Sequence, residues 1–308
     1  MKKILDFGSF VVDLMARAPH LPKEAETVKG TVFKMGAGGK GFNQAVAAKK
    51  AGADVVMVTK LGKDDFANVA LNTMKELNMD TSHLIFTDKT STGIALICVD
   101  ENTGQNQIMV VPASCDTITE SEVENLSPLM DACDILLLQL EVNLSAIEKV
   151  IAMAKQKNMT IVLNTAPVQK ISDALLSQID IITPNEVEAG ILTDTIIKDE
   201  KDAKRAADIF KQKGVKNVII TMGSQGAFMS TETTEKMIAS IKVNAIDTTG
   251  AGDAFNGGFV TALAEGKSIE EAVKFANCVG ALSVQKLGTT PSMPTRSEID
   301  AMYNEHYK

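Results

Sequence analysis

The 308-residue sequence lacks a long hydrophobic run, a CxxC pair and an excess of basic residues. No apolar stretch approaches the ~18–20 residues that a membrane span needs, so we expect no transmembrane helix. The start, MKKILDFG, has two lysines but no long apolar segment, and it predicts a first strand rather than a signal peptide. The net charge of −8 argues against nucleic acid as the main partner but leaves small anions open.

Cysteine is scarce, with four residues in the chain: Cys98, Cys115, Cys133 and Cys278. Their neighbours are mostly apolar, so we expect buried free thiols in a cytoplasmic protein. Hydrophobic residues make up 45% and charged residues 23%, which is ordinary for a globular protein with a sizeable core. The length suits one large α/β domain or two small ones.

Short apolar runs alternate with helical patterns along most of the chain. Strands are predicted over residues 3–10, 54–62, 134–141, 160–167, 180–186 and 217–224, with helices such as 144–158 and 200–214 between them. This alternation predicts a doubly wound, mostly parallel sheet between helix layers. Sites in such sheets lie beyond the carboxyl ends of the strands, where Glu141, Asn164, Asn185, Glu186, Gly223 and Gly226 fall.

Two regions, about 11–36 and 92–112, break this alternation. Both have strand character without intervening helices, and the second contains the turn ENTG. We interpret them as a small antiparallel sheet that forms a lid on a single domain spanning 1–308. An edge hairpin without function is the alternative.

The segment DTTGAGDAFNGGF, 247–259, places small residues directly before an acid and a helical pattern. A helix N-terminus offers unpaired N–H groups, and small residues let an anion approach them. Asp253 beside such an anion hole suits a general base that deprotonates a hydroxyl during phosphoryl transfer. A helix N-cap is the structural alternative for this residue.

A second glycine cluster, GAGGKGFNQAVAA at 36–48, also precedes a helical pattern. Lys40 and Asn43 there offer hydrogen-bond donors to a polyhydroxy ligand, whereas the glycines alone would fit a tight helix–sheet contact. Neither cluster has P-loop spacing, and no GxGxxG closes the first strand, which disfavours a dinucleotide-binding oxidoreductase.

Together, GAGGKGFNQA and DTTGAGDAFNGGF resemble the two signatures of the ribokinase (PfkB) family of carbohydrate kinases, with TPNEVEA, TMGSQGA and KLGTTPSMP in the family order. The resemblance covers essentially the whole chain and implies transfer of the ATP γ-phosphate to a sugar hydroxymethyl group. Asp253 would be the base, and the N–H groups of Gly250, Ala251, Gly252 and Asp253 would hold the phosphate. A non-catalytic sugar-binding protein is disfavoured because GAGD is intact.

The resemblance also implies sites for nucleotide and metals. Asn185, Thr221, Gly223, Gly226 and Asn277 would bind the nucleotide, and Glu188 would act on Mg²⁺ through water; taken alone, Glu188 could be a solvated helix residue. A K⁺ site would involve Asp247, Thr249, Ser283, Lys286, Gly288 and Ser292. Asp247 could instead simply start a turn by bonding its own backbone.

Sugar contacts implied by the resemblance are Asp13, Gly39, Lys40, Asn43 and Glu141. Ribokinases carry GSxNxD where this chain has GSFVVD, so Val11 replaces an asparagine that bonds a ribose hydroxyl. An apolar residue there resembles deoxyribokinases and favours 2-deoxyribose over ribose, unless a water compensates. Fructokinase-like and nucleoside kinase activities remain alternatives. We further expect a homodimer formed through the lid, covering its exposed strand edges and apolar positions such as Ile94 and Ile97.

Overall fold

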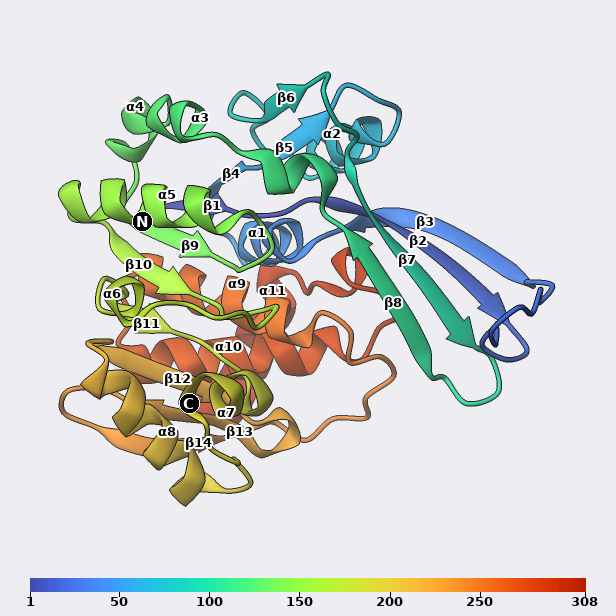
Figure 1. Cartoon of the computed structure of the whole chain (residues 1–308). Coiled ribbons are helices and arrows are strands. Elements are labelled where there is room, and N and C mark those ends of the chain that lie inside the picture. Colours follow the sequence, from blue (N-terminus) through green and yellow to red (C-terminus); the bar gives the residue numbers. More distant parts are fainter.

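An eight-stranded sheet runs through the centre of the molecule (Figure 1). The structure is a computed structural model that describes all 308 residues. The strand order is β14-β13-β12-β11-β10-β9-β1-β4, parallel except at β13 and β14. The strands are β1 (Lys3–Phe7), β4 (Asp54–Val58), β9 (Ile135–Leu138), β10 (Thr160–Leu163), β11 (Ile181–Ile182), β12 (Asn217–Thr221), β13 (Gly226–Ser230) and β14 (Glu235–Ala239). The mostly parallel sheet expected from the sequence is confirmed.

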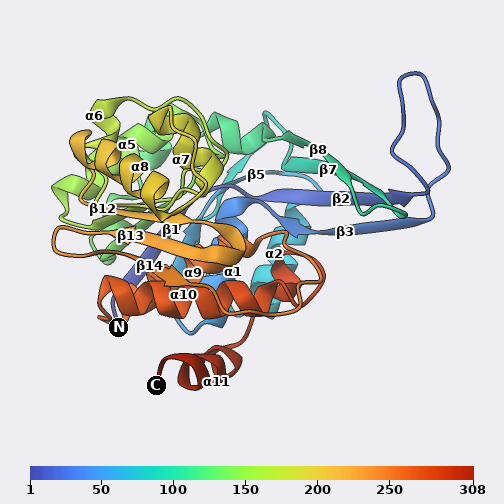
Figure 2. The same ribbon diagram turned by 90° about the horizontal axis from the view of Figure 1, so that it is seen from below.

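Helices cover both faces of this sheet, as Figure 2 shows from below. Strand side chains alternate between two cores: Ile4 of β1 enters one, and Leu5 and Phe7 enter the other. The first core packs against α1 (Lys40–Lys50), α2 (Ala67–Glu76), α9 (Ala251–Ala264), α10 (Ile269–Ser283) and α11 (Arg296–Tyr307). The second packs against α3 (Glu120–Glu124), α4 (Ser127–Met130), α5 (Leu144–Gln156), α6 (Asp173–Leu176), α7 (Glu186–Thr193) and α8 (Glu200–Gln212). None of these helices is long and apolar enough to cross a membrane.

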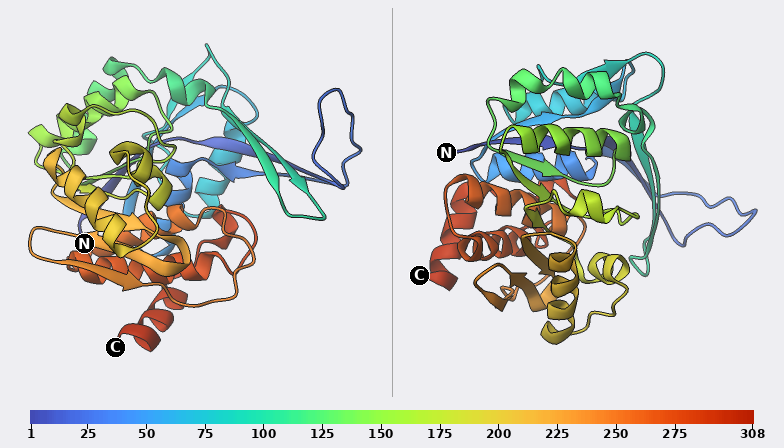
Figure 3. Two further views of the ribbon diagram at one scale, coloured as in Figure 1. Left: turned by 60° about the horizontal axis from the view of Figure 1, so that its bottom comes forward. Right: turned by 60° about the vertical axis from the view of Figure 1, so that its left-hand side comes forward.

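A separate four-stranded sheet projects from one side of the body (Figure 3). Its order is β3-β2-β7-β8, with bounds β2 (Val11–Ala18), β3 (Val32–Gly38), β7 (Gly93–Asp100) and β8 (Asn106–Val111). We call it the lid sheet. The two regions that break the helix–strand alternation therefore do form one sheet. A two-stranded sheet of β5 (Lys60–Gly62) and β6 (Ile85–Thr87) lies nearby.

The lid sheet is not wholly antiparallel, which corrects the sequence-based expectation. Each hairpin, β2–β3 and β7–β8, is antiparallel, but the central strands β2 and β7 pair in parallel from Val11↔Gly93 to Ala18↔Asp100. Both central strands leave the body in the same direction, so they meet side by side in parallel. Local patterns identify hairpins, but they carry no information on how two distant hairpins join.

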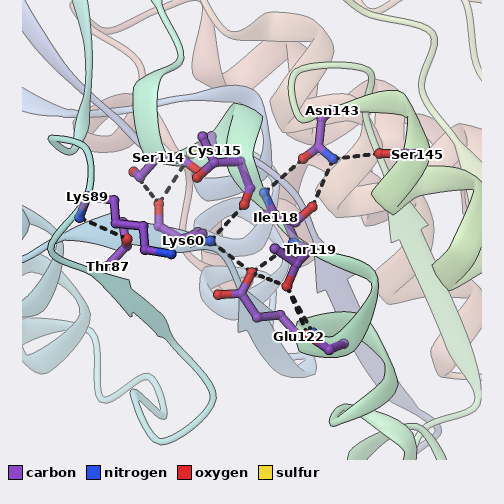
Figure 4. Close-up of polar contacts among 12 residues, drawn as sticks. Lys60, Thr87, Lys89, Ser114, Cys115, Ile118, Thr119, Glu122, Asn143 and Ser145 are labelled. Carbon is purple, nitrogen blue, oxygen red and sulfur yellow. Dashed lines mark hydrogen bonds and ion pairs between the residues drawn. The ribbon is translucent and has the colours of Figure 1, made fainter.

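The return of β8 to the body is anchored by buried polar contacts (Figure 4). The short helix η1 (Ala113–Thr117) follows β8, and the Ser114 hydroxyl donates to the Lys60 carbonyl at 2.7 Å. The buried Lys60 ammonium donates to the Thr117 carbonyl at 2.7 Å and to Glu122 at 2.8 Å. These contacts fix the segment after the lid sheet, so that the sheet projects from a firm base.

Candidate active site

The carboxyl ends of the central strands carry a layer of buried polar side chains. Gln139, Asn164 and Thr183 follow β9, β10 and β11 and are at most 6% exposed. Each lies two residues after a strand residue of the first core, so these side chains lie on the sheet face that α1 and α9 cover. Polar side chains thus gather at the sheet edge that the sequence predicts, beneath the N-terminus of α9.

Asp253 lies in the first turn of α9 and is 7% exposed. Gly250, with a φ of 77°, occupies the N-cap, so the capping interpretation of Asp253 is wrong. Its carboxylate instead accepts from Asn43 Nδ2 at 3.0 Å and from Gln44 Nε2 at 3.0 Å. Burial raises the pKa of Asp253, and the positive charge of Lys40 opposes this shift.

The turn before Asp253 presents backbone donors. The N–H groups of Gly252 and Asp253 have no acceptor within the chain, whereas that of Ala251 bonds the Thr248 carbonyl at 3.2 Å. A Cβ built on Gly252 would meet no atom within 4 Å, so the backbone faces open space. Free N–H groups at the positive end of a helix can bind an anion beside the Asp253 carboxylate.

Three acids and one lysine share this neighbourhood. Glu141 accepts from the Lys40 N–H at 2.8 Å and from Ser9 Oγ at 2.5 Å. Burial and the charges of Glu141 and Asp253 raise the pKa of Asp13 to about 6. Burial alone would lower the pKa of Lys40, but Asp253, Glu141 and Glu188 outweigh it and the net shift is upward. Asp13, Lys40, Asn43 and Glu141 therefore lie near Asp253, and their role as sugar contacts stays a prediction.

The glycine cluster before α1 makes the tight helix–sheet contact that was considered for it. Gly39 has a φ of 94° and a Cβ there would lie 2.9 Å from the Val11 nitrogen, so the turn needs glycine. A Cβ on Gly41 would come within 2.6 Å of the Ser9 nitrogen, so α1 packs tightly on the end of β1. This close contact sets Lys40 and Asn43 beside Asp253.

A cavity of about 640 Å³ opens on the other side of the α9 N-terminus. Its lining includes the nucleotide-site residues predicted from sequence: Asn185, Thr221, Gly223, Gly226 and Asn277, together with Ala251 and Gly252. Sequence reasoning missed several residues that complete the wall, among them Lys242, Val243, Ala245, Thr248 and Phe255. The cavity reaches the glycine turn at Ala251 and Gly252, directly before Asp253 in the chain.

Glu188 is 9% exposed, so its interpretation as a solvated helix residue is wrong. Asn185 caps α7, and Glu188 completes the capping box by accepting from the Asn185 backbone N–H at 3.1 Å. Its carboxylate also accepts from Asn185 Nδ2 at 2.9 Å and from Thr165 Oγ1 at 3.1 Å. No group of three acidic, histidine or cysteine residues could hold a metal ion. Any Mg²⁺ here would be held mainly by phosphate oxygens and water, near the fixed carboxylate of Glu188.

The positions expected for a monovalent cation lie in the loop before α9 and in the segment that begins at the end of α10. Asp247 accepts from the Thr249 N–H and from the Gly288 N–H, each at 2.9 Å, and so joins the loops before α9 and after α10. It therefore starts a turn and also bridges two loops. Ser283 and Ser292 are buried and bond nearby carbonyls, whereas the Lys286 side chain reaches Glu298 instead. These side chains therefore already have partners within the chain, and the cation site stays a prediction.

Val11 is 3% exposed but belongs to neither core, unlike its neighbours Phe10 and Val12. It lies two residues before Asp13 on β2, so both side chains point to the same face of the lid sheet. Gly38 and Gly93 flank it on the neighbouring strands. Val11 therefore shares its face of the lid sheet with Asp13, whose pKa is affected by the charge of Asp253.

Buried acids, a lysine, a helix N-terminus and an adjoining cavity at the sheet edge are features of an α/β phosphotransferase. The pfkB family carbohydrate kinase model matches residues 1–296. The ribokinase of Haemophilus influenzae is 42% identical over 299 residues, covering 97% of each chain, and the deoxyribokinase of Salmonella typhi is 35% identical, covering 94% of each. The Arabidopsis thaliana ribokinase, solved with ribose and ATP, is 28% identical with a TM-score of 0.90 and covers 98% of each chain.

The chain belongs to the pfkB family of carbohydrate kinases. It is therefore a phosphotransferase that acts on a sugar, with the ribokinase-like fold.

Asp13→Asn should stabilise the fold at neutral pH. The pKa of Asp13 is raised to about 6 from 3.8, so its ionisation is penalised in the folded state. This penalty is absent well below pH 3.8, grows as the pH rises from there through about 6, and is constant above that. At most ~3 kcal/mol of unfolding free energy should be gained at pH 8, because each pKa unit corresponds to 1.36 kcal/mol.

Urea denaturation of both proteins at pH 4.5, 6 and 8 measures this difference. The exposed Asp116→Asn is the control and should show no such trend. A gain for Asp13→Asn that is the same at every pH would contradict the assignment.

Proposed function

We propose that the protein transfers the ATP γ-phosphate to the terminal hydroxymethyl group of a pentose, at the 5-position of 2-deoxyribose or ribose. The observation that carries this is Asp253, buried between two amide donors and directly beside free N–H groups at the start of α9. The relatives that support it are ribokinases and deoxyribokinases, and ATP occurs in the Arabidopsis ribokinase complex.

In this reaction Asp253 acts as the general base. The amides of Asn43 and Gln44 hold its two oxygens, leaving a lone pair to accept the proton of the sugar hydroxyl. Asp13, Lys40 and Glu141 bind the other hydroxyl groups and orient the sugar. The N–H groups of Gly252 and Asp253 stabilise the negative charge that develops on the transferring phosphoryl group.

The 640 Å³ cavity accommodates the nucleotide in this proposal. Asn277 and the glycines at 223 and 226 line its wall, and Lys242 adds a positive charge suited to phosphate. Mg²⁺ bound to the phosphates would be oriented through water by Glu188, and K⁺ behind the glycine turn would strengthen its field. Four free thiols and a need for ATP lead us to infer a cytoplasmic location.

Asp253→Asn should lower kcat by ~10²-fold or more, because the amide keeps the size but cannot accept the proton. The KM for ATP should change little. In the wild type, activity should fall as the pH drops through the raised pKa of Asp253, since only the carboxylate is a base.

A coupled ADP-release assay across pentoses, ketohexoses and nucleosides measures these rates, with the exposed Asp88→Asn as control. An Asp253→Asn variant that turns over at the wild-type rate would exclude the proposed base.

The sugar preference should depend on Val11. Its methyl groups lie where ribose would present a hydroxyl, and an unpaired buried hydroxyl costs ~1–3 kcal/mol. We therefore expect kcat/KM to favour 2-deoxyribose over ribose by about 3- to 100-fold, since 1.4 kcal/mol is a factor of ten.

Val11→Asn should narrow or reverse that ratio by restoring a hydrogen-bond partner. The measurement is kcat/KM for both pentoses in both proteins. If the wild type prefers ribose and Val11→Asn has the same ratio of kcat/KM for the two pentoses, then Val11 does not discriminate this hydroxyl.

The lid sheet has an exposed apolar face that supports a homodimer. One row of apolar residues crosses all four strands on the face opposite Asp13: Met35, Leu14, Leu96 and Met109. Met35, Leu96 and Met109 are 53%, 42% and 64% exposed. Ile94 and Ile97, by contrast, are already half-buried, so they are not the main apolar surface that a dimer would cover.

Sedimentation at micromolar concentration should show a dimer, and Met109→Glu should yield a monomer because it buries a charge in the interface. Ile108→Glu, on the same strand but on the other face and 53% exposed, is the matched control and should remain dimeric. A monomeric wild type would reject the dimer.

A further inference from the structure

Asp6 is a fully buried acid that the proposed reaction does not use. It lies in β1 and is 0% exposed. Its partners across the sheet form an otherwise apolar row: Met57, Leu137, Val162 and Ile181. A carboxylate in such a place is costly unless it is paired or carries a proton.

Only two buried side-chain oxygen or nitrogen atoms in the molecule have no hydrogen-bond partner. They are Asp6 Oδ2 and Gln139 Oε1. Both belong to the same contact, because Gln139 Nε2 donates to the other Asp6 oxygen, Oδ1, at 3.1 Å. A proton on Asp6 Oδ2 would make this oxygen a donor, which the second unpartnered atom, Gln139 Oε1, can accept. The carboxyl and the amide could then form two hydrogen bonds, one in each direction.

The same amide continues to the active site. Gln139 Nε2 also donates to Gln44 Oε1 at 2.9 Å. With its oxygen held, Gln44 directs its Nε2 to Asp253 Oδ1 at 3.0 Å and to Asn164 Oδ1 at 3.1 Å. Hydrogen bonds therefore connect Asp6 to Asp253 through two buried amides.

We propose that Asp6 is a positioning residue, a neutral carboxyl that pairs with the Gln139 amide and, through Gln139 and Gln44, sets the orientation of the Asp253 carboxylate. This inference rests on the proposed role of Asp253 as base. Asp6 does not touch the sugar or the phosphate.

The surroundings of Asp6 favour its neutral form. Burial raises the pKa of Asp6 well above its ordinary value, and the charge of Asp253 on α9 raises it further. Hydrogen bonds from Gln139 on the β9 side and from the Ala45 backbone on α1 oppose this without reversing it. Across the sheet it faces only Met57 of β4 and Leu137 of β9. A neutral Asp6 also spares Asp253 a second negative charge nearby. Such a charge would raise the pKa of Asp253 and favour its protonated form, which cannot accept the hydroxyl proton.

Two substitutions separate the hydrogen bond from the charge. Asp6→Asn offers one acceptor and one donor without ionising, so kcat should remain within about threefold of wild type. Asp6→Val removes both groups, and kcat should fall about tenfold with the KM for ATP unchanged, because a misplaced base slows the chemical step. Thr59→Val, which removes a buried hydroxyl just after the adjacent strand β4, is the matched control and should keep wild-type kcat.

The wild-type protein provides a measurement that needs no active variant. With ¹³C-labelled aspartate, the Asp6 carboxyl resonance, identified by its loss in Asp6→Asn, should stay at the protonated position from pH 6 to pH 8. This readout stands even where Asp253→Asn shows that Asp253 is not the base, so the two failures can be told apart.

The proposal is overturned by an Asp6 resonance at the ionised position at pH 7. It is equally overturned by a folded Asp6→Val with wild-type kcat, or by a folded Asp6→Asn that loses as much kcat as Asp6→Val. Thermal unfolding of each variant establishes that it is folded.

Discussion

The close packing of α1 against α9 is the contact on which the rest of the site depends. A Cβ on Gly257 of α9 would come within 2.5 Å of the Ala47 Cβ and 2.6 Å of the Gln44 carbonyl, so only glycine permits this approach. At this separation the short amides of Asn43 and Gln44 reach the Asp253 carboxylate. If α1 and α9 were further apart by the width of a side chain, the carboxylate would be buried without hydrogen-bond donors. The free-energy cost of such an unpaired buried charge is larger than a surface contact can offset.

Electrostatics then decides what the pocket can bind. The charges of Asp253, Glu141 and Glu188 act on Lys40, and Asp13 lies near Glu141 and Asp253. The side of the glycine turn proposed for the sugar therefore has a surplus of acceptors. Hydroxyl groups suit such a surface because each can donate to a carboxylate, whereas a phosphate would be repelled. The opposite side of the turn has free N–H groups and Lys242 and suits an anion. The glycine turn thus separates a region for a neutral polyol from a region for a charged phosphate, which is the arrangement that phosphoryl transfer requires.

Much of this could be predicted from the sequence, for identifiable physical reasons. Continuous apolar runs mark strands buried on both faces, and these gave the parallel sheet; glycine clusters before helices marked both sides of the site. The parallel pairing of β2 with β7 could not be predicted, because it joins segments about eighty residues apart with no local signal. A solvated position stayed open as an alternative for Glu188, because its capping box with Asn185 and its hydrogen bond from Thr165 depend on how α7 is placed. Lys242 and Phe255 reach the cavity only through the tertiary fold.

The roles of Asp6 and Gln139 could not be predicted either, because they too depend on the tertiary fold. In KILDF the acid shares its strand face with Ile4, so the local pattern does not show whether that face is solvated, and only the packing of α1 and α9 on the first core buries it. A buried row with one acid and two unpartnered oxygens does not improve the stability of the core, since an apolar residue would fill the same place without desolvation cost. Asp6 is instead explained by its hydrogen bond to Gln139, which in turn bonds the Gln44 amide that holds Asp253. The amide of Gln139 could rotate if its far end met only apolar side chains, and Gln44 would lose the acceptor–donor order that aims its nitrogen at the carboxylate. In this proposal the buried acid in β1 lowers the stability of the fold, and in return it fixes the orientation of Asp253 in α9.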